Sequence, residues 1–328
     1  MKAKLKRLTS WSSLPAIVLF IVFLIINVSV NPGFLSPSFL HTYLMANTPA
    51  LCVIMGICAA KIAGGIDISL GCLLALVNCT VAQLSSKTDM EFGPIVLIAL
   101  AIGLFGGTLN GVMIGIFRIT PLLATFATNY VFGGLALWVM PTPGGFNVSK
   151  VFIKFYNTLL GGFFPPTMIF ILVPLIIWLF FSKSPMGVRL YAIGRDEQNA
   201  YISGMPVAGV KMFVHIFGGL AAALGGIAVT GMIASGDPLV GTELSLRSIA
   251  AVVIGGVALA GGEGDIWGAV FGGLFLNMVQ LTVVNTKIPT FTQNLANAAI
   301  LFFGLLISII ISARSNSAPK MAKLGGAK

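Results

Sequence analysis

The sequence has few charged residues: Asp, Glu, Lys and Arg together make up 9% of its 328 residues. Soluble domains carry roughly 25% charged residues, so this chain cannot cover a water-facing surface of ordinary size. Hydrophobic residues reach 57%, and the mean hydropathy is +1.01. The scarcity of charge excludes a soluble protein and predicts an all-α polytopic membrane protein.

The sequence also lacks the common motifs of catalysis and nucleotide binding. It contains no Gly-x-x-x-x-Gly-Lys-Ser/Thr, which excludes a P-loop for ATP in this chain. The two histidines, His41 and His215, are far apart and have no carboxylate or cysteine at ligand spacing. No nucleophile motif has a plausible base. We therefore expect no catalytic residue, no metal and no cofactor in this chain.

Cysteine is scarce, and all four cysteines fall in apolar runs. We interpret them as small buried side chains rather than disulfide partners or metal ligands; they are Cys52, Cys58, Cys72 and Cys79.

Apolar segments fill most of the chain and predict about ten transmembrane helices in a single transmembrane domain, 1–328. The segment at 248–261 is short, and the break at 62–67 is so tight that the second and third segments could form one broken or re-entrant unit. The predicted spans are 14–30, 44–62, 67–85, 93–116, 120–140, 167–182, 212–232, 248–261, 265–284 and 291–312.

Positive charge gives this arrangement an orientation. If the N-terminus is cytoplasmic and the spans alternate, all but five of the 19 Lys and Arg residues face the cytoplasm, as the positive-inside rule requires. Both termini (1–13 and 313–328) and the long loop 183–211 are then cytoplasmic. The basic start resembles a signal peptide, but no cleavage site follows, so we expect a retained first helix. Topology thus explains the net charge of +10, and we expect contact with membrane lipid and not with nucleic acid.

A degraded repeat links the two halves of the chain. Residues 65–77, Gly-Ile-Asp-Ile-Ser-Leu-Gly-Cys-Leu-Leu-Ala-Leu-Val, reappear at 241–253 as Gly-Thr-Glu-Leu-Ser-Leu-Arg-Ser-Ile-Ala-Ala-Val-Val. In the ten-span arrangement the two copies run in opposite directions, so spans 2–5 and 7–10 form an inverted repeat. Inverted repeats are typical of transporters, with the substrate site at the repeat interface.

Acidic residues are rare and lie at predicted helix ends. For Asp67 we favour capping or gating over direct substrate contact. Neutral polar residues lie deeper in the spans, and they would suit a neutral, hydroxylated solute or equally form interhelical hydrogen bonds; they are Asn78, Asn110, Thr125, Asn129, Asn277 and Gln280.

Three ordered motifs within about 44–310 resemble those of ribose-type sugar permeases of bacterial ABC importers, in the branched-chain amino acid and sugar permease family. They are Gly-Gly-Ile-Asp-Ile-Ser-Leu-Gly at 64–71, Tyr-Ala-Ile-Gly at 191–194 with Ser-Gly-Met-x-Val at 203–207, and Ile-Ala-Ala-Val-Val-Ile-Gly-Gly at 249–256 with Gly-Gly-x-Gly at 261–264. The resemblance implies a permease subunit that transports a monosaccharide by alternating access.

The resemblance also implies partners. They are a second permease subunit, identical or paralogous; a cytoplasmic ATPase that binds ATP and Mg²⁺; and a periplasmic or lipid-anchored sugar-binding protein. The ATPase would contact a short helix at 196–203, capped by Asp196 and stopped by Gly204, and the coupling residues would be Gly194, Arg195, Asp196, Glu197, Ala200, Ser203 and Gly204. The translocation pathway would include Gly64, Gly65, Asp67 and Ser69 with the neutral polar residues above, and Glu243 and Arg247 would lie at the outer mouth.

Two departures from the family pattern concern the partners. Arg195-Asp196 replaces the usual Gly-Asn, and Arg247 stands where the family often has Asp. The first suggests a matched ATPase, and the second altered binding-protein docking or a heteromeric permease pair. The alternatives are a permease for a nucleoside, a furanose-like signal or a branched-chain amino acid, or an ion-coupled secondary transporter, which would need no helix for an ATPase.

Overall fold

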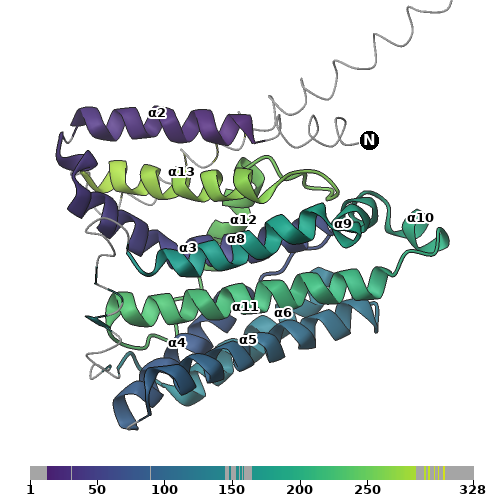
Figure 1. Ribbon diagram of the computed structural model, residues 1–328, viewed down its shortest axis with the longest axis horizontal. Coiled ribbons are helices and arrows are strands. Elements are labelled where there is room, and N and C mark those ends of the chain that lie inside the picture. The colour runs from purple at the N-terminus through teal and green to yellow at the C-terminus, as the bar shows by residue number, and fades with distance from the viewer. Residues whose placement is uncertain are drawn as a thin grey trace, which may run out of the picture.

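The protein is described by a computed structural model that covers residues 13–285 apart from 31, 89 and most of 145–164, with a few isolated positions between 292 and 306. Within that part the chain is a bundle of α-helices whose long members, such as α2, α5, α11 and α13, run in roughly the same direction (Figure 1). The helices are α2 (Leu14–Val30), α3 (Pro37–Ile62), α4 (Leu70–Lys87), α5 (Phe92–Gly115), α6 (Pro121–Val139), α8 (Met168–Lys183), α9 (Pro185–Arg195), α10 (Glu197–Ile202), α11 (Val207–Ile233), α12 (Leu244–Ile254) and α13 (Ile266–Asn285), with a short 3₁₀ helix, η1, at Pro32–Leu35.

Six of these helices are long and apolar enough to cross a membrane, and α8 with α9, bent by 83°, would make a seventh. Helices α2 and α12 are apolar but shorter. Nine of the ten predicted spans thus correspond to helices of the structure. Only six or seven of them, however, are long and apolar enough to cross a membrane. The tenth, 291–312, lies outside the described residues except for isolated positions.

Local sequence explains where several helices begin. The Ser36 side chain accepts a hydrogen bond from the Phe39 N–H, and the Ser184 side chain accepts one from the Gly187 N–H; a proline follows each serine at the first helical position. Serine at the N-cap with proline at N1 is a strong start signal. The predicted cap of the short loop helix is also confirmed, because the Asp196 carboxylate accepts a hydrogen bond from the Asn199 N–H at 2.9 Å.

Helix α11 lies at the centre of the bundle and packs against α3, α4 and α5 (Figure 1). Its contact with α5 depends on a ladder of small residues. At Gly103, Gly107, Gly111 and Gly115 of α5, an added Cβ would overlap the α11 backbone or fall within 3 Å of it. Glycines four residues apart on one helix face let two membrane helices approach backbone to backbone.

Two unwound segments interrupt the bundle, 63–69 before α4 and 234–243 before α12. The second is joined to the segment that follows α6 by backbone hydrogen bonds between Gly144 and Gly236 in both directions. Each segment overlaps the start of one copy of the sequence repeat, at 65–69 and 241–243, and the rest of each copy forms the beginning of α4 or α12.

Candidate functional site

The two repeat copies meet inside the bundle. The backbone N–H of Gly71, in the first turn of α4, donates to Ser245 Oγ at the start of α12 at 3.0 Å. A side chain at Gly71 would overlap the Gly241 carbonyl, and one at Gly241 would overlap Gly71 in turn. The contact therefore requires glycine on both sides. The serine of the second copy supplies a partner for an N–H that has none within its own helix.

A buried polar network fixes the unwound segment before α4. Asp67 Oδ1 accepts hydrogen bonds from Ser69 N at 3.0 Å and Ser69 Oγ at 2.7 Å, and Asp67 Oδ2 lies 2.9 Å from His215 Nδ1 on α11. Ser69 Oγ accepts from Asn110 on α5, and Asn110 Oδ1 accepts from Thr128 on α6. We call these five residues the Asp67 network. All are buried, and together they tie α4, α5, α6 and α11 to one point.

Nearby, Thr125 holds the same segment through its backbone. Its hydroxyl donates to Ile66 O at 3.2 Å and accepts from Ile68 N at 3.4 Å. Gly65 lies against Pro121, at the start of the same helix as Thr125. Asn129, one turn further along α6, is half-buried and has no hydrogen bond from its side chain to the described residues.

Asn78 lies near the end of α11 and not in a cavity. Its amide nitrogen donates to Thr230 Oγ1 at 2.9 Å and Ser235 O at 3.0 Å, and its amide oxygen accepts from Asp237 N at 2.8 Å. The side chain is buried and has partners on both amide atoms. Of the two interpretations made from sequence, this geometry favours interhelical hydrogen bonding.

Three segments meet at the ends of α3, α9 and α12. We call Gly64, Gly194, Gly261 and Gly262 the glycine junction. A Cβ on Gly194 would overlap the Ile62 carbonyl, and Gly262 N donates to that carbonyl at 2.9 Å. Gly64, Gly261 and Gly262 have φ of 85°, 89° and 70°, a region that L side chains rarely adopt. The three sequence motifs, which are far apart along the chain, are therefore in backbone contact here.

Polar contacts strengthen the glycine junction. Arg195 and Glu263 form an ion pair at 2.6 Å, and the Tyr191 hydroxyl donates to Gly264 O at 3.0 Å. Burial raises the pKa of the Asp265 carboxyl, although its hydrogen bond from Ile266 N opposes the shift. Helix α9 is thus bound to the α12–α13 loop as well as to the end of α3.

Helix α10 projects from the bundle just beyond the glycine junction, at the end where α2 begins (Figure 1). All its residues except Ala200 are exposed, including the apolar Ile202 at 72%. Glu197 pairs with Lys211 at 2.6 Å, and the Arg118 guanidinium lies over the Tyr201 ring at 4.5 Å. Ser203 Oγ donates to Asn199 O, and Gly204, with φ of 77°, ends the helix. An open groove of about 570 Å³ runs between α10, the start of α11 and the end of α5.

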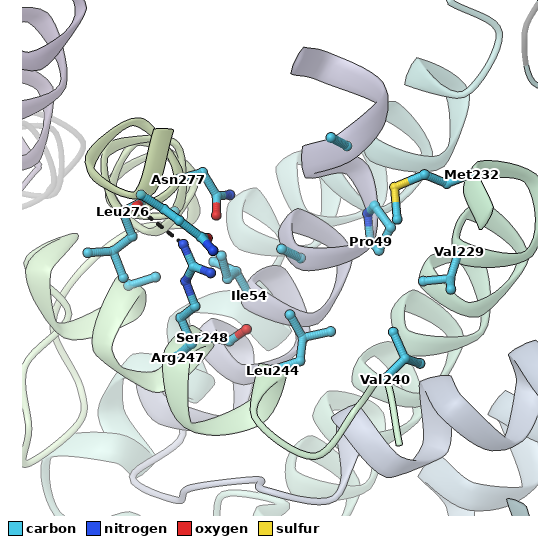
Figure 2. Close-up of a pocket in the computed structure, with 15 residues that line it drawn as sticks. Pro49, Ile54, Val229, Met232, Val240, Leu244, Arg247, Ser248, Leu276 and Asn277 are labelled. Carbon is cyan, nitrogen blue, oxygen red and sulfur yellow. Dashed lines mark hydrogen bonds between the residues drawn. The ribbon is translucent and has the colours of Figure 1, made fainter. Parts of the chain in front are cut away.

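A cavity of about 210 Å³ lies between α3, the end of α11, α12 and α13 (Figure 2). Arg247 and Ser248 of α12 and Asn277 and Gln280 of α13 supply its polar groups, and the rest of its lining is apolar. The cavity therefore brings together Arg247, which was predicted to lie at the outer mouth, with Asn277 and Gln280, which were predicted to line the translocation pathway. Glu243 is exposed at the start of α12 and does not line this cavity.

Several participants could not be identified from sequence spacing. His215 was dismissed because no acid lies near it in the chain, yet it contacts Asp67 across 148 residues. A single ionisable residue within the long apolar run of α11 was the available signal. The sequence contained no such signal for Thr128, Ser245 and Ser248, because serine and threonine are common in membrane helices. Among the described residues, no group of three or more His, Cys, Asp or Glu could hold a metal ion.

The fold and these contacts describe a multi-pass membrane protein with a central polar network and a helix displayed at one end. The family model described as "Branched-chain amino acid transport system / permease component" matches residues 38–310. The chain therefore belongs to this family of permeases. It is a non-catalytic, multi-pass subunit of the ABC transporter class in the bacterial cytoplasmic membrane.

Individual relatives cover most of the chain. The ribose import permease protein of Bacillus subtilis is 33% identical over 89% of this chain and 91% of its own length. The D-allose transport system permease protein of Escherichia coli is 27% identical over 79% of both chains, and the autoinducer 2 import system permease protein of Photorhabdus temperata is 27% identical over 90% of both. No solved structure matches the chain.

Proposed function

We propose that this protein forms the membrane pathway of an ABC importer for a monosaccharide. The observation that carries the proposal is the contact, at the glycine junction, of α9 with the unwound segment 63–69 and with the α12–α13 loop. Helix α9 leads directly to α10. A force applied to α10 by a cytoplasmic ATPase would pass through α9 to Ile62, Gly64 and the α12–α13 loop. The ribose and allose permeases among the relatives favour a sugar as the substrate.

In this proposal ATP and Mg²⁺ are bound by the partner ATPase, and the present chain supplies no catalytic group. The exposed face of α10, with the neighbouring groove, is the docking surface for the ATPase. Alternating access would open the bundle first toward the sugar-binding protein and then toward the cytoplasm. A second permease subunit, identical or paralogous, completes the pathway.

The proposed topology has ten spans, an inverted repeat and both termini in the cytoplasm. Contacts between loops support it. The loops assigned to the cytoplasm meet one another, since residues 62–64 contact 194 and 261–262, Arg195 pairs with Glu263, and Arg118 contacts Tyr201. The loops assigned to the outside also meet, through Gly144 and Gly236. No contact among these joins a loop of one group to a loop of the other.

An uptake measurement tests the proposed function. The chain would be reconstituted in liposomes with the ATPase and binding protein encoded by neighbouring reading frames. We expect enclosed vesicles to accumulate radiolabelled D-ribose or D-allose only with ATP on the ATPase side. Accumulation without the ATPase, driven by a proton gradient, would instead establish a secondary transporter.

The import of a furanose-like signal is the second candidate. It is favoured by the autoinducer 2 permease, which matches nearly as much of the chain as the ribose permease does. Competition by unlabelled autoinducer 2 in the same vesicles distinguishes the two substrates, because only a shared pathway would reduce sugar accumulation.

A further inference from the structure

The cavity between α3, α11, α12 and α13 contains a positive charge without an ionic partner. Arg247 projects from α12 toward α13, where its guanidinium donates one hydrogen bond to Leu276 O at 3.3 Å (Figure 2). A guanidinium has five N–H donors, and this contact uses one of them. The side chain is half-buried and lines the cavity, so the remaining donors are available to a molecule that enters it.

No acid within the described residues neutralises Arg247. The chain has nine Asp and Glu residues, and all except Asp89 lie in the described part. The ion pairs found there use Glu263, Glu197 and Asp67, and none of them includes Arg247. Glu243, one turn earlier on α12, interacts with Arg247 electrostatically but forms no ion pair with it. Glu243 is also exposed, which weakens its influence by solvent screening.

A second observation points to a ligand. Ser248 Oγ is buried, its residue is 1% exposed, and it has no hydrogen-bond partner among the described residues. A buried hydroxyl without a hydrogen-bond partner is unfavourable, so such atoms normally have a protein group, a water or a ligand beside them. Ser248 follows Arg247 directly and lines the same cavity, together with the amides of Asn277 and Gln280.

Size limits the occupant. Sites for drug-sized molecules have roughly 300–1,000 Å³, and this cavity has about 210 Å³. A solute of monosaccharide size suits it better. Its apolar lining, including Ile54 and Leu244, would contact the carbon skeleton, while the polar groups on α12 and α13 face the solute from one side (Figure 2).

We propose that this cavity binds an acidic, polyhydroxylated solute of monosaccharide size, with Arg247 on its oxyanion and Ser248 and Asn277 on its hydroxyl groups. The inference rests on the proposed function as a solute permease and extends its substrate class from neutral monosaccharides to sugar acids or sugar phosphates. A planar guanidinium pairs with carboxylate or phosphate through two parallel hydrogen bonds. A partly buried charge without a counter-ion is less well solvated than in water, and a bound anion compensates for that loss in a way that a neutral sugar cannot.

The test compares three probes that share one carbon skeleton: D-ribose, D-ribonate and D-ribose 5-phosphate. The full chain would be purified with its ATPase and permease partners in lipid nanodiscs, without the binding protein, and its thermal unfolding would be followed at increasing probe concentrations. We expect at least one of the acids to raise the unfolding midpoint at a concentration about tenfold lower than D-ribose requires. Stabilisation by D-ribonate would indicate a carboxylate ligand, and stabilisation by D-ribose 5-phosphate would indicate a phosphate ligand.

Variants assign the effect to the cavity. Arg247→Gln should abolish the preference for the acid, and Arg247→Lys should retain part of it, because lysine keeps the charge without the bidentate geometry. Ser248→Ala should weaken binding of the preferred acid by several-fold. Lys87→Gln, which removes an exposed positive charge at the end of α4 and outside the lining of this cavity, should leave the preference unchanged.

Equal or stronger stabilisation by D-ribose, no stabilisation by either acid, or an acid preference that survives Arg247→Gln would each overturn the inference. Its failure is distinguishable from failure of the proposed function. ATP-driven uptake of D-ribose with no Arg247-dependent acid binding would refute the acidic substrate alone. Arg247-dependent acid binding in a complex that transports nothing with ATP would refute the ATP-driven importer instead.

Discussion

The two copies of the repeat use the same position for opposite purposes. Gly71 and Arg247 are equivalent in the repeat. At Gly71 the first copy presses against the backbone of Gly241, so no side chain fits there. At Arg247 the second copy faces a cavity, so a long cationic side chain is accommodated. The mismatch between the copies therefore reflects two environments. Gly71 lies in a tight backbone contact between the two copies, and Arg247 lies beside a cavity.

The Asp67 network provides the first prediction. Asp67→Asn removes the charge that faces His215 while keeping the size of the side chain. Because asparagine cannot satisfy all the buried donors that the carboxylate accepts from, we expect a loss of about 1–3 kcal/mol of stability. Thermal unfolding in detergent would measure it, with His215→Gln as the partner variant. If Asp67 and His215 act through each other, the double variant should lose much less than the sum of the two single losses; additive losses would contradict the pairing.

Sequence identified Asp67, Ser69, Asn110 and Thr125 as a group of polar residues in apolar surroundings, and the structure places all four around one unwound segment. It did not reveal their partner, because His215 lies 148 residues from Asp67. Sequence also could not separate Asn78, which is hydrogen-bonded between helices, from Asn277, which lines a cavity. Both are amides in apolar runs, and only tertiary packing distinguishes their environments.

At the scale of single helices, sequence was most informative where a start or stop signal is local. The cap at Asp196 and the stop at Gly204 define α10 within one residue of the prediction. The prediction placed a helix boundary wrongly where the helix extends beyond the apolar run that was used to define it. Helix α3 begins at Pro37 and not near residue 44, because the Ser36 cap and the proline start the helix in a mixed polar and apolar stretch, 37–43, ahead of the continuous apolar run.

The α5–α11 contact gives a prediction at this scale. A methyl group at Gly107 would overlap the His215 carbonyl, so the two helices would have to separate. We expect Gly107→Ala to lower stability by about 1–3 kcal/mol, the usual cost of overpacking. Gly134→Ala in α6 is the matched control, since nothing lies within 4 Å of its added Cβ. That change should be neutral or stabilise the helix by up to about 1 kcal/mol. Thermal unfolding of the two variants side by side measures the difference, and equal midpoints would contradict the close packing.

For the whole molecule, contacts between distant loops agree with the proposed grouping of the loops on two sides of the membrane, while the side that faces the cytoplasm is proposed from the positive charges alone. Sequence supplied the alternation of spans, and the structure groups the loops as that alternation requires. Neither the packing of α11 at the centre nor the meeting of the three motifs at the glycine junction could be derived from periodicity, because both depend on backbone contacts between helices far apart in the chain.

Orientation can be tested by cysteine labelling, because the four native cysteines are buried. Thr242→Cys lies on the segment assigned to the outside, and Gln198→Cys lies on α10; both positions are exposed. A membrane-impermeant maleimide should label Thr242→Cys in right-side-out vesicles and Gln198→Cys only after the membrane is opened. The reverse pattern would contradict the proposed topology.

Energy transfer from an ATPase through α10 is the central claim, and Ile202 tests it most directly. Its exposed apolar side chain is suited to a partner pocket, while its truncation or replacement disturbs no contact within the bundle core. The measurement is ATP hydrolysis by the reconstituted complex after addition of sugar-loaded binding protein. We expect Ile202→Asp to reduce the stimulated rate by about tenfold or more, as for the loss of an interface hot spot, and Ile202→Leu to preserve it. Undiminished stimulation in the aspartate variant would contradict the account.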